Sequence, residues 1–72
     1  MKEDINFLLG KRLRELRKKH KLTQQQLAEL ADIDYKHIQL LEGKNPSSPK
    51  LTTIAKVAKA FKITPSKLID FK

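Results

Sequence analysis

Apolar residues recur at the spacing of a helix face in several stretches of the chain, and no stretch shows the strict alternation of a strand. The first stretch spans residues 4–19, and another spans residues 50–61. Their predicted core stripes are Ile5, Leu9, Leu13 and Leu16 in the first and Leu51, Ile54, Ala58 and Phe61 in the other. Gly10 is a poor helix former within the first stretch, which indicates either a tolerated cost or close packing against a neighbouring element.

Two short helices with well-marked ends are predicted over residues 23–42. Thr23 followed by Gln26 forms a capping box, and Asp34 is the expected N-cap of the second helix of the pair. The tight turn between them requires a left-handed residue at Asp32, and aspartate tolerates that conformation better than most residues. Gly43 marks the end of the second helix. Many proteins use such a pair to insert one helix into the major groove of DNA.

The rest of the chain completes a small all-α domain. Residues 43–50 are the only clear loop, because glycine, asparagine, serines and prolines are concentrated there. A short helix is predicted over residues 65–70, with Thr64 as its N-cap and Pro65 at its first position. The sequence thus predicts one domain of five helices over residues 1–72. A chain of this length builds only a modest core, which makes an oligomer a natural supplement.

The net charge of +8 indicates a polyanionic partner, and nucleic acid is the commonest one. Residues 1–22 and residues 50–72 each carry a net charge of +5, whereas residues 23–49 carry −2. If the protein binds DNA, the flanks supply much of the general attraction and the middle supplies the contacts. The alternative is that the lysines of the flanks form a solvated face that serves only solubility.

Several classes of function lack the residues that they require. There is no cysteine, and His20 and His37 have no metal-ligand spacing around them, so we expect no metal site. No glycine-rich phosphate loop and no local pairing of nucleophile and base is present, so we expect neither an enzyme nor a cofactor. No apolar run approaches the length of a membrane span, and the first residues do not form a signal peptide. We therefore expect a soluble, cytoplasmic protein.

A larger set of residues, from Gly10 to Leu68, follows a known pattern. Its members are Gly10, Arg12, Leu13, Arg14, Leu16, Arg17, Leu22, Thr23, Gln24, Leu27, Ala28, Ala31, Ile33, Ile38, Leu41, Glu42, Thr53, Ile54, Val57, Ala58, Lys59, Ala60, Phe61 and Leu68. Their order and spacing resemble the lambda-repressor-like helix-turn-helix family, also called the Cro or xenobiotic-response-element type. The resemblance implies a five-helix DNA-binding domain. The chain departs from the family at Asp32, where glycine or asparagine is usual, and at Gly43, before which the family commonly inserts a residue.

The resemblance implies that Tyr35, Lys36 and Leu40 face the base edges of DNA. Lys36, Gln39 and Leu40 fall on the outer face of their predicted helix. Lys36 can donate to guanine acceptors, Leu40 can pack on thymine methyl groups, and Gln39 can bond adenine or a phosphate. Two alternatives stay open. Leu40 would join the core if the helix were rotated, and Tyr35 would pack on the preceding helix.

The residues expected to contact the DNA backbone are Gln24, Gln25, His37, Lys44 and Asn45. Gln24 lies at a helix N-terminus, where free backbone N–H groups favour an anion, and the family places this glutamine on a phosphate. The family's loop that corresponds to Lys44 and Asn45 often touches the backbone. The alternatives are a plain early-helix residue for Gln24 and packing for His37.

The resemblance also implies a partly buried ion pair between Arg17 and Glu42. In relatives the matching pair ties the first helix to the end of the third. We expect the two side chains to be hydrogen-bonded and to orient the reading helix without reading DNA themselves.

The leading hypothesis is a sequence-specific regulator of transcription that binds a two-fold operator in double-stranded DNA as a homodimer, of the repressor or restriction-modification controller type. We expect the dimer to form mainly through the C-terminal end, because a helix over residues 65–70 is too short to bury both Ile69 and Phe71 within its own domain. In the competing arrangement, Phe71 folds back on the first helix and the protein is a monomer until it meets DNA. The alternative function is an antitoxin or other protein-interaction module with autoregulatory DNA binding.

Overall fold

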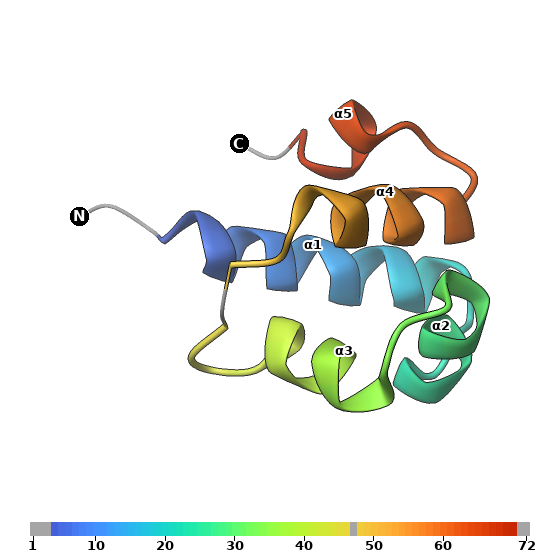
Figure 1. Ribbon diagram of the computed structural model, residues 1–72, viewed down its shortest axis with the longest axis horizontal. Coiled ribbons are helices and arrows are strands. Elements are labelled where there is room, and N and C mark those ends of the chain that lie inside the picture. Colours follow the sequence, from blue (N-terminus) through green and yellow to red (C-terminus); the bar gives the residue numbers. More distant parts are fainter. Residues whose placement is uncertain (1–3, 47, 71–72) are drawn as a thin grey trace.

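Five α-helices follow one another in residues 4–46 and 48–70, the part of the chain that this computed structural model describes (Figure 1). They are α1 (Ile5–Lys19), α2 (Gln24–Ala31), α3 (Tyr35–Glu42), α4 (Leu51–Ala60) and α5 (Pro65–Leu68). In Figure 1, α2 and α3 lie at one end of the molecule and α5 lies at the opposite end, with α1 and α4 between them. The predicted all-α fold is confirmed.

Side chains cap the N-termini of most of these helices. Asp4, Thr23, Asp34 and Thr64 each accept a hydrogen bond from a backbone N–H two or three residues further on. At α2 the side chain of Gln26 also accepts from the N–H of Thr23 at 2.9 Å, so the predicted capping box is present. The observed boundaries follow the predicted ones closely, except that α5 ends two residues before the predicted position 70.

Left-handed residues end three of the helices, and none of them is glycine. They are Lys21, Asp32 and Lys62, with φ values of 57°, 57° and 60°. After Asp32 the N–H of Ile33 donates to the carbonyl oxygen of Ala28 at 2.9 Å, which closes the last turn of α2. The residues that follow the three left-handed positions pack against the core; they are Leu22, Ile33 and Ile63. Gly43, in contrast, follows α3 in an extended conformation with φ −80° and ψ −174°.

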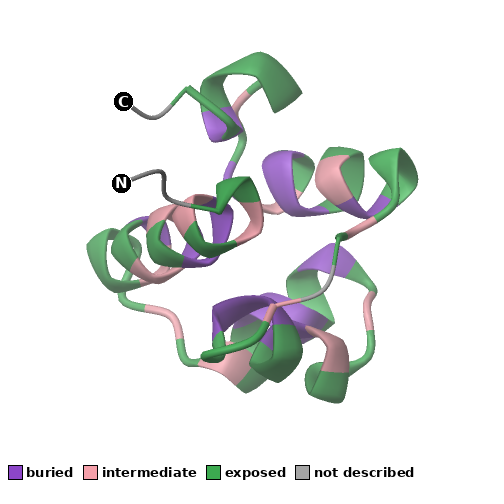
Figure 2. Cartoon of the chain, turned by 90° about the vertical axis from the view of Figure 1, so that its left-hand side faces the viewer, coloured by how far each residue is buried: buried purple, intermediate pink, exposed green. Residues whose placement is uncertain are grey.

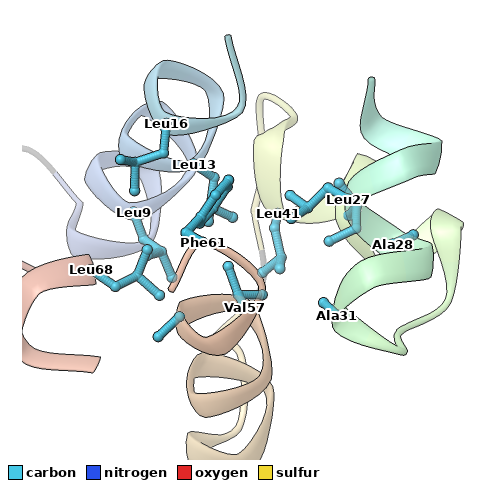
Figure 3. Packing of buried hydrophobic residues seen from close by; sticks show 12 residues of the cluster. Leu9, Leu13, Leu16, Leu27, Ala28, Ala31, Leu41, Val57, Phe61 and Leu68 are labelled. Atoms are coloured by element: carbon cyan, nitrogen blue, oxygen red, sulfur yellow. The ribbon is translucent and has the colours of Figure 1, made fainter. Parts of the chain in front are cut away.

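One apolar core receives side chains from all five of these helices. Its members are Leu9, Leu13, Leu16, Leu27, Ala28, Ala31, Ile38, Leu41, Val57, Ala58, Phe61 and Leu68. Figure 2 shows that the buried segments of the helices turn toward one another, and Figure 3 shows the side chains meeting between the helices. Phe61 is only 1% exposed, and its ring lies 5.1 Å from that of His20. The core therefore connects α1, α4 and α5 to the α2–α3 pair.

Two residues of the predicted core stripes are exposed, which corrects the prediction. Ile5 is 66% exposed and Leu51 is 85% exposed. Each is the first residue of its helix, so it lies beyond the elements that cover the later turns. The rest of the stripe predicted for residues 50–61 agrees with the structure: Ala58 and Phe61 are buried and Ile54 packs against the core. Thr53 and Val57 are buried as well.

Gly10 lies at the contact between α1 and α3. A Cβ atom built on Gly10 would overlap the carbonyl oxygen of Leu41 and would also meet the backbone of Glu42. Of the two readings of this glycine, close packing is therefore the one that applies. The missing side chain lets the C-terminal end of α3 approach α1.

Candidate nucleic-acid interface

Helix α3 turns one face to the core and the opposite face to solvent. Ile38 and Leu41 are 0% and 2% exposed, and Figure 3 shows Leu41 pointing into the core. The residues exposed on the other face are Tyr35, Lys36, Gln39 and Leu40. Leu40 keeps 56% of its surface accessible, so the rotated alternative that would bury it does not occur. The four residues expected to read bases thus share one open face.

A hydrogen bond links two of the residues on this face. The Nε2 of Gln39 donates to the hydroxyl oxygen of Tyr35 at 3.2 Å, across one helical turn. The Tyr35 ring also lines two shallow hollows against α2, one of which includes Gln24 and Gln25. Tyr35 is nevertheless 39% exposed, so it lies beside α2 and also reaches the outer face.

The carboxylate of Glu42 joins α1, α2 and α3. It accepts hydrogen bonds from Nε and Nη2 of Arg17, both at 2.9 Å, and from Nε2 of Gln24 at 3.1 Å. The Glu42 side chain is 2% exposed and that of Arg17 is 15% exposed. A planar guanidinium bound through two parallel N–H groups fixes the carboxylate in one orientation. The ion pair expected from the resemblance is therefore present and partly buried.

The environment of Arg17 favours its charged form. The hydrogen bond with Glu42 raises the pKa of the Arg17 guanidinium, burial opposes that change, and the negative charge of Glu42 adds to it. Nη1 of Arg17 also donates to the carbonyl oxygen of Leu22 at 3.1 Å. Arg17 thus holds the α1–α2 connection and the end of α3 together.

Gln24 has a partner that its sequence position did not indicate. Its side chain is bonded to Glu42, so it is neither a plain early-helix residue nor fully extended into solvent. The capping box satisfies the backbone N–H groups of Thr23 and Gln26. The backbone N–H groups of Gln24 and Gln25, in the first turn of α2, donate to no acceptor within the described part of the chain.

The loop after α3 is tied to the start of α1. Nδ2 of Asn6 donates to Oγ of Ser48 at 3.0 Å. Lys44 and Asn45, which precede this tether, are exposed. His37 is half-buried on the flank of α3, between its inner and outer faces. The predicted backbone contacts therefore flank the outer face of α3 on two sides: Gln24 and Gln25 at the start of α2, and Lys44 and Asn45 in the loop.

Two arginines hold helix ends in a way that the residue pattern did not reveal. Nη2 of Arg14 donates to the carbonyl oxygen of Glu42 at 2.8 Å, which caps the C-terminus of α3. Nη2 of Arg12 donates to the carbonyl oxygen of Lys67 at 2.9 Å and thereby holds α5. Both residues belong to the pattern shared with the family, but backbone carbonyl partners leave no mark in the sequence.

Of the two residues expected at a dimer interface, only Ile69 lies in the described part of the chain. Ile69 follows α5 and is 48% exposed. Phe71 lies outside the described residues. Among residues 4–46 and 48–70, no helix is long and apolar enough to cross a membrane, and no cluster of ligands could hold a metal ion.

Comparison with known proteins agrees with this geometry. The family described as "Helix-turn-helix domain" matches residues 10–71. Among solved structures, the restriction-modification controller protein C.AhdI from Aeromonas hydrophila superposes with a TM-score of 0.81 at 35% sequence identity, covering 88% of this chain and 94% of that one. No curated protein sequence matches the chain. The match over residues 10–71 includes α2, α3 and the side chains that hold them, so the chain belongs to the helix-turn-helix family of DNA-binding regulators.

Proposed function

We propose that this protein is a sequence-specific regulator of transcription that reads double-stranded DNA with the outer face of α3. The observation that carries the proposal is the division of α3 into two faces. Buried Ile38 and Leu41 fix the helix in the core, while Tyr35 and Leu40 remain 39% and 56% exposed on the opposite side. A helix held in this way can enter the major groove without losing its packing.

The side chains on the open face supply complementary ways to distinguish bases. Lys36 can donate to the O6 and N7 atoms of guanine, and Gln39 can bond adenine. Leu40 offers an apolar surface to thymine methyl groups. The hydrogen bond between Tyr35 and Gln39 restrains the amide of Gln39 before DNA arrives, which lowers the entropy cost of ordering it.

Residues on both sides of α3 are suited to hold the DNA backbone. The free N–H groups at the start of α2, with the side chains of Gln24 and Gln25, form a site for a phosphate. Lys44 and Asn45 offer a second site in the loop, and His37 offers a further contact from the flank of α3. Backbone contacts of this kind fix the position of the reading helix and carry no sequence information.

We further propose that the protein binds a two-fold operator as a homodimer. One domain reads only half a site, and a two-fold pair of domains can place a reading helix in each of two successive major grooves. Exposed apolar side chains gather near the N-terminal turn of α1, where Ile5 and Phe7 flank Asn6, and at the start of α4, where Leu51 is exposed. The Asn6–Ser48 hydrogen bond ties the first turn of α1 to the loop that precedes α4. Ile69 is a further exposed apolar residue, after α5. The likeness to a controller protein supports a regulator of that type, acting in the cytoplasm.

Selection of bound sites from random duplex DNA tests the proposal. We expect an enriched motif with two-fold symmetry. Lys36→Ala and Leu40→Ala should relax the base preference at particular positions of the motif. Gln24→Ala should instead lower the affinity for all sites by a similar amount. Absence of any enriched motif at low and at moderate salt would overturn the proposal, since a reading helix without sequence preference has no regulatory use. Lys11→Ala, at an exposed site on α1, serves as the matched control for loss of one positive charge.

A further inference from the structure

A groove between α4 and α5 lies at the end of the molecule away from the reading helix. Its lining residues are Ala55, Lys59, Lys62, Ile63, Thr64, Pro65 and Lys67. Its volume is about 980 Å³, which is larger than a single side chain needs. In Figure 1, α5 and α3 lie on opposite sides of the molecule, so DNA on the outer face of α3 leaves this groove open.

The groove combines an apolar floor with a positive rim. Ala55, Ile63 and Pro65 supply the apolar surface, and Ile63 is anchored against the core. The lysines at positions 59, 62 and 67 are all exposed. Within the described part of the chain, each ion pair involves Glu42, so these lysines have no carboxylate partner. The C-terminus of a helix favours a nearby cation, and this effect by itself explains a lysine at position 59. It does not explain why apolar residues line the groove beside the lysines.

Lys62 lies in the turn between α4 and α5, in the same left-handed conformation that Lys21 adopts after α1. It occupies the left-handed site after α4, with φ 60°, where glycine is the easiest choice. The backbone N–H of Lys62 donates to the carbonyl oxygen of Lys59 at 3.0 Å, and the next residue, Ile63, packs against the core. These two contacts fix the turn. Lys62 therefore lines the groove from a turn whose backbone is held in place.

We infer that the groove between α4 and α5 is a docking site for an acidic amphipathic segment of a partner protein. An apolar side chain of such a segment fits the floor, and its carboxylates meet Lys59, Lys62 and Lys67. A DNA backbone would match the lysines but would leave the apolar floor uncovered. A second copy of the chain carries the same net charge of +8, so it matches a groove lined by lysines less well than an acidic segment does. The occupant is therefore a protein segment that can bind while α3 holds DNA.

The test uses the full chain and a fluorescent synthetic peptide that carries one leucine per helical turn with glutamates between the leucines. Amide chemical shifts of the ¹⁵N-labelled protein locate its site, and fluorescence anisotropy measures its affinity. We expect shifts confined to residues 55–67. The double variant Lys59→Glu/Lys67→Glu should bind the peptide about tenfold more weakly or worse, because two favourable charge pairs become repulsive. The parent protein should bind a peptide that has glutamine in place of glutamate more weakly by a similar factor.

The control variant Lys11→Glu/Lys19→Glu changes the net charge equally at exposed sites outside the groove and should retain most of the peptide affinity. An equal loss in both variants would show that only the general charge attracts the peptide, and would overturn the inference. Absence of peptide binding, shifts on α2 and α3, or displacement of the peptide by duplex DNA would overturn it as well. A fall in oligomer mass in Lys59→Glu/Lys67→Glu would assign the groove to a second copy instead. Selection of DNA sites with the Lys59→Glu/Lys67→Glu variant tests the regulator proposal separately, because that proposal does not depend on peptide binding.

Discussion

Replacement of Glu42 by leucine is expected to destabilise the protein more than simultaneous replacement of Glu42 and Arg17. In the single variant the guanidinium of Arg17, whose side chain is 15% exposed, loses both 2.9 Å bonds to the carboxylate and keeps the carbonyl of Leu22. Leaving one partner of a buried pair uncompensated costs about 3–5 kcal/mol. Because Arg17 retains some contact with water, we expect about 3 kcal/mol for Glu42→Leu.

The double variant Arg17→Met/Glu42→Leu replaces both charged groups by apolar groups of similar size. Such replacements are often close to neutral, so we expect a loss of about 1 kcal/mol, from the bonds to Gln24 and Leu22 that remain unmade. The single variant Arg17→Met should fall between these values, because Arg14, already 3.9 Å from the carboxylate, can take part of the role of Arg17.

Urea unfolding followed by circular dichroism measures these differences. A domain of this size has a free energy of unfolding of about 4–11 kcal/mol, so a loss of about 3 kcal/mol is readily resolved. It also corresponds to a fall in Tm of about 12–24 °C. Glu15→Leu, at an exposed acidic residue of α1, is the control and should change stability by less than about 0.5 kcal/mol. A loss for Glu42→Leu below about 1 kcal/mol, the value for an exposed pair, would refute the reasoning. So would a double variant that loses the sum of both single losses.

Other outcomes follow from the same structure. Gly10→Ala should lower the free energy of unfolding by about 1–3 kcal/mol in thermal melts, because the new Cβ meets backbone of α3 that cannot move aside. Gly43→Ala is the control: Gly43 is in an extended conformation, so the loss should be less than about 1 kcal/mol. Equal losses in the two variants would contradict this account. Asp32→Gly should raise stability by roughly 0.5–1 kcal/mol, since glycine relieves the left-handed strain at φ 57°, and an unchanged or lower Tm would count against it. Affinity for a selected operator should fall linearly with salt on logarithmic axes, and a flat response would argue against phosphate contacts. In sedimentation at micromolar concentration the parent should be a dimer and Ile69→Lys/Leu51→Lys a monomer, with Lys11→Ala as the unshifted control.

The sequence by itself determined the helices, their ends and the family. Helix ends depend on local bonds, so Thr23, Asp34 and Thr64 could be recognised as caps before any packing was known. The left-handed turn at Asp32 followed from the same local reasoning. The inner and outer faces of α3 also followed, because Ile38 and Leu41 recur at helical spacing and only one side of an eight-residue helix can face the core.

Tertiary structure alone decided which elements approach one another. Periodicity assigned Ile5 and Leu51 to the core, but it says nothing of whether a neighbour covers the first turn of a helix, and both residues are exposed. The reason for Gly10 became clear only when Leu41 was found beside it. The bond from Gln24 to Glu42 likewise joins residues far apart in the chain, and the groove between α4 and α5 depends on how these two helices meet. Contacts of this kind depend on the angles between helices, which packing sets and which no local pattern encodes.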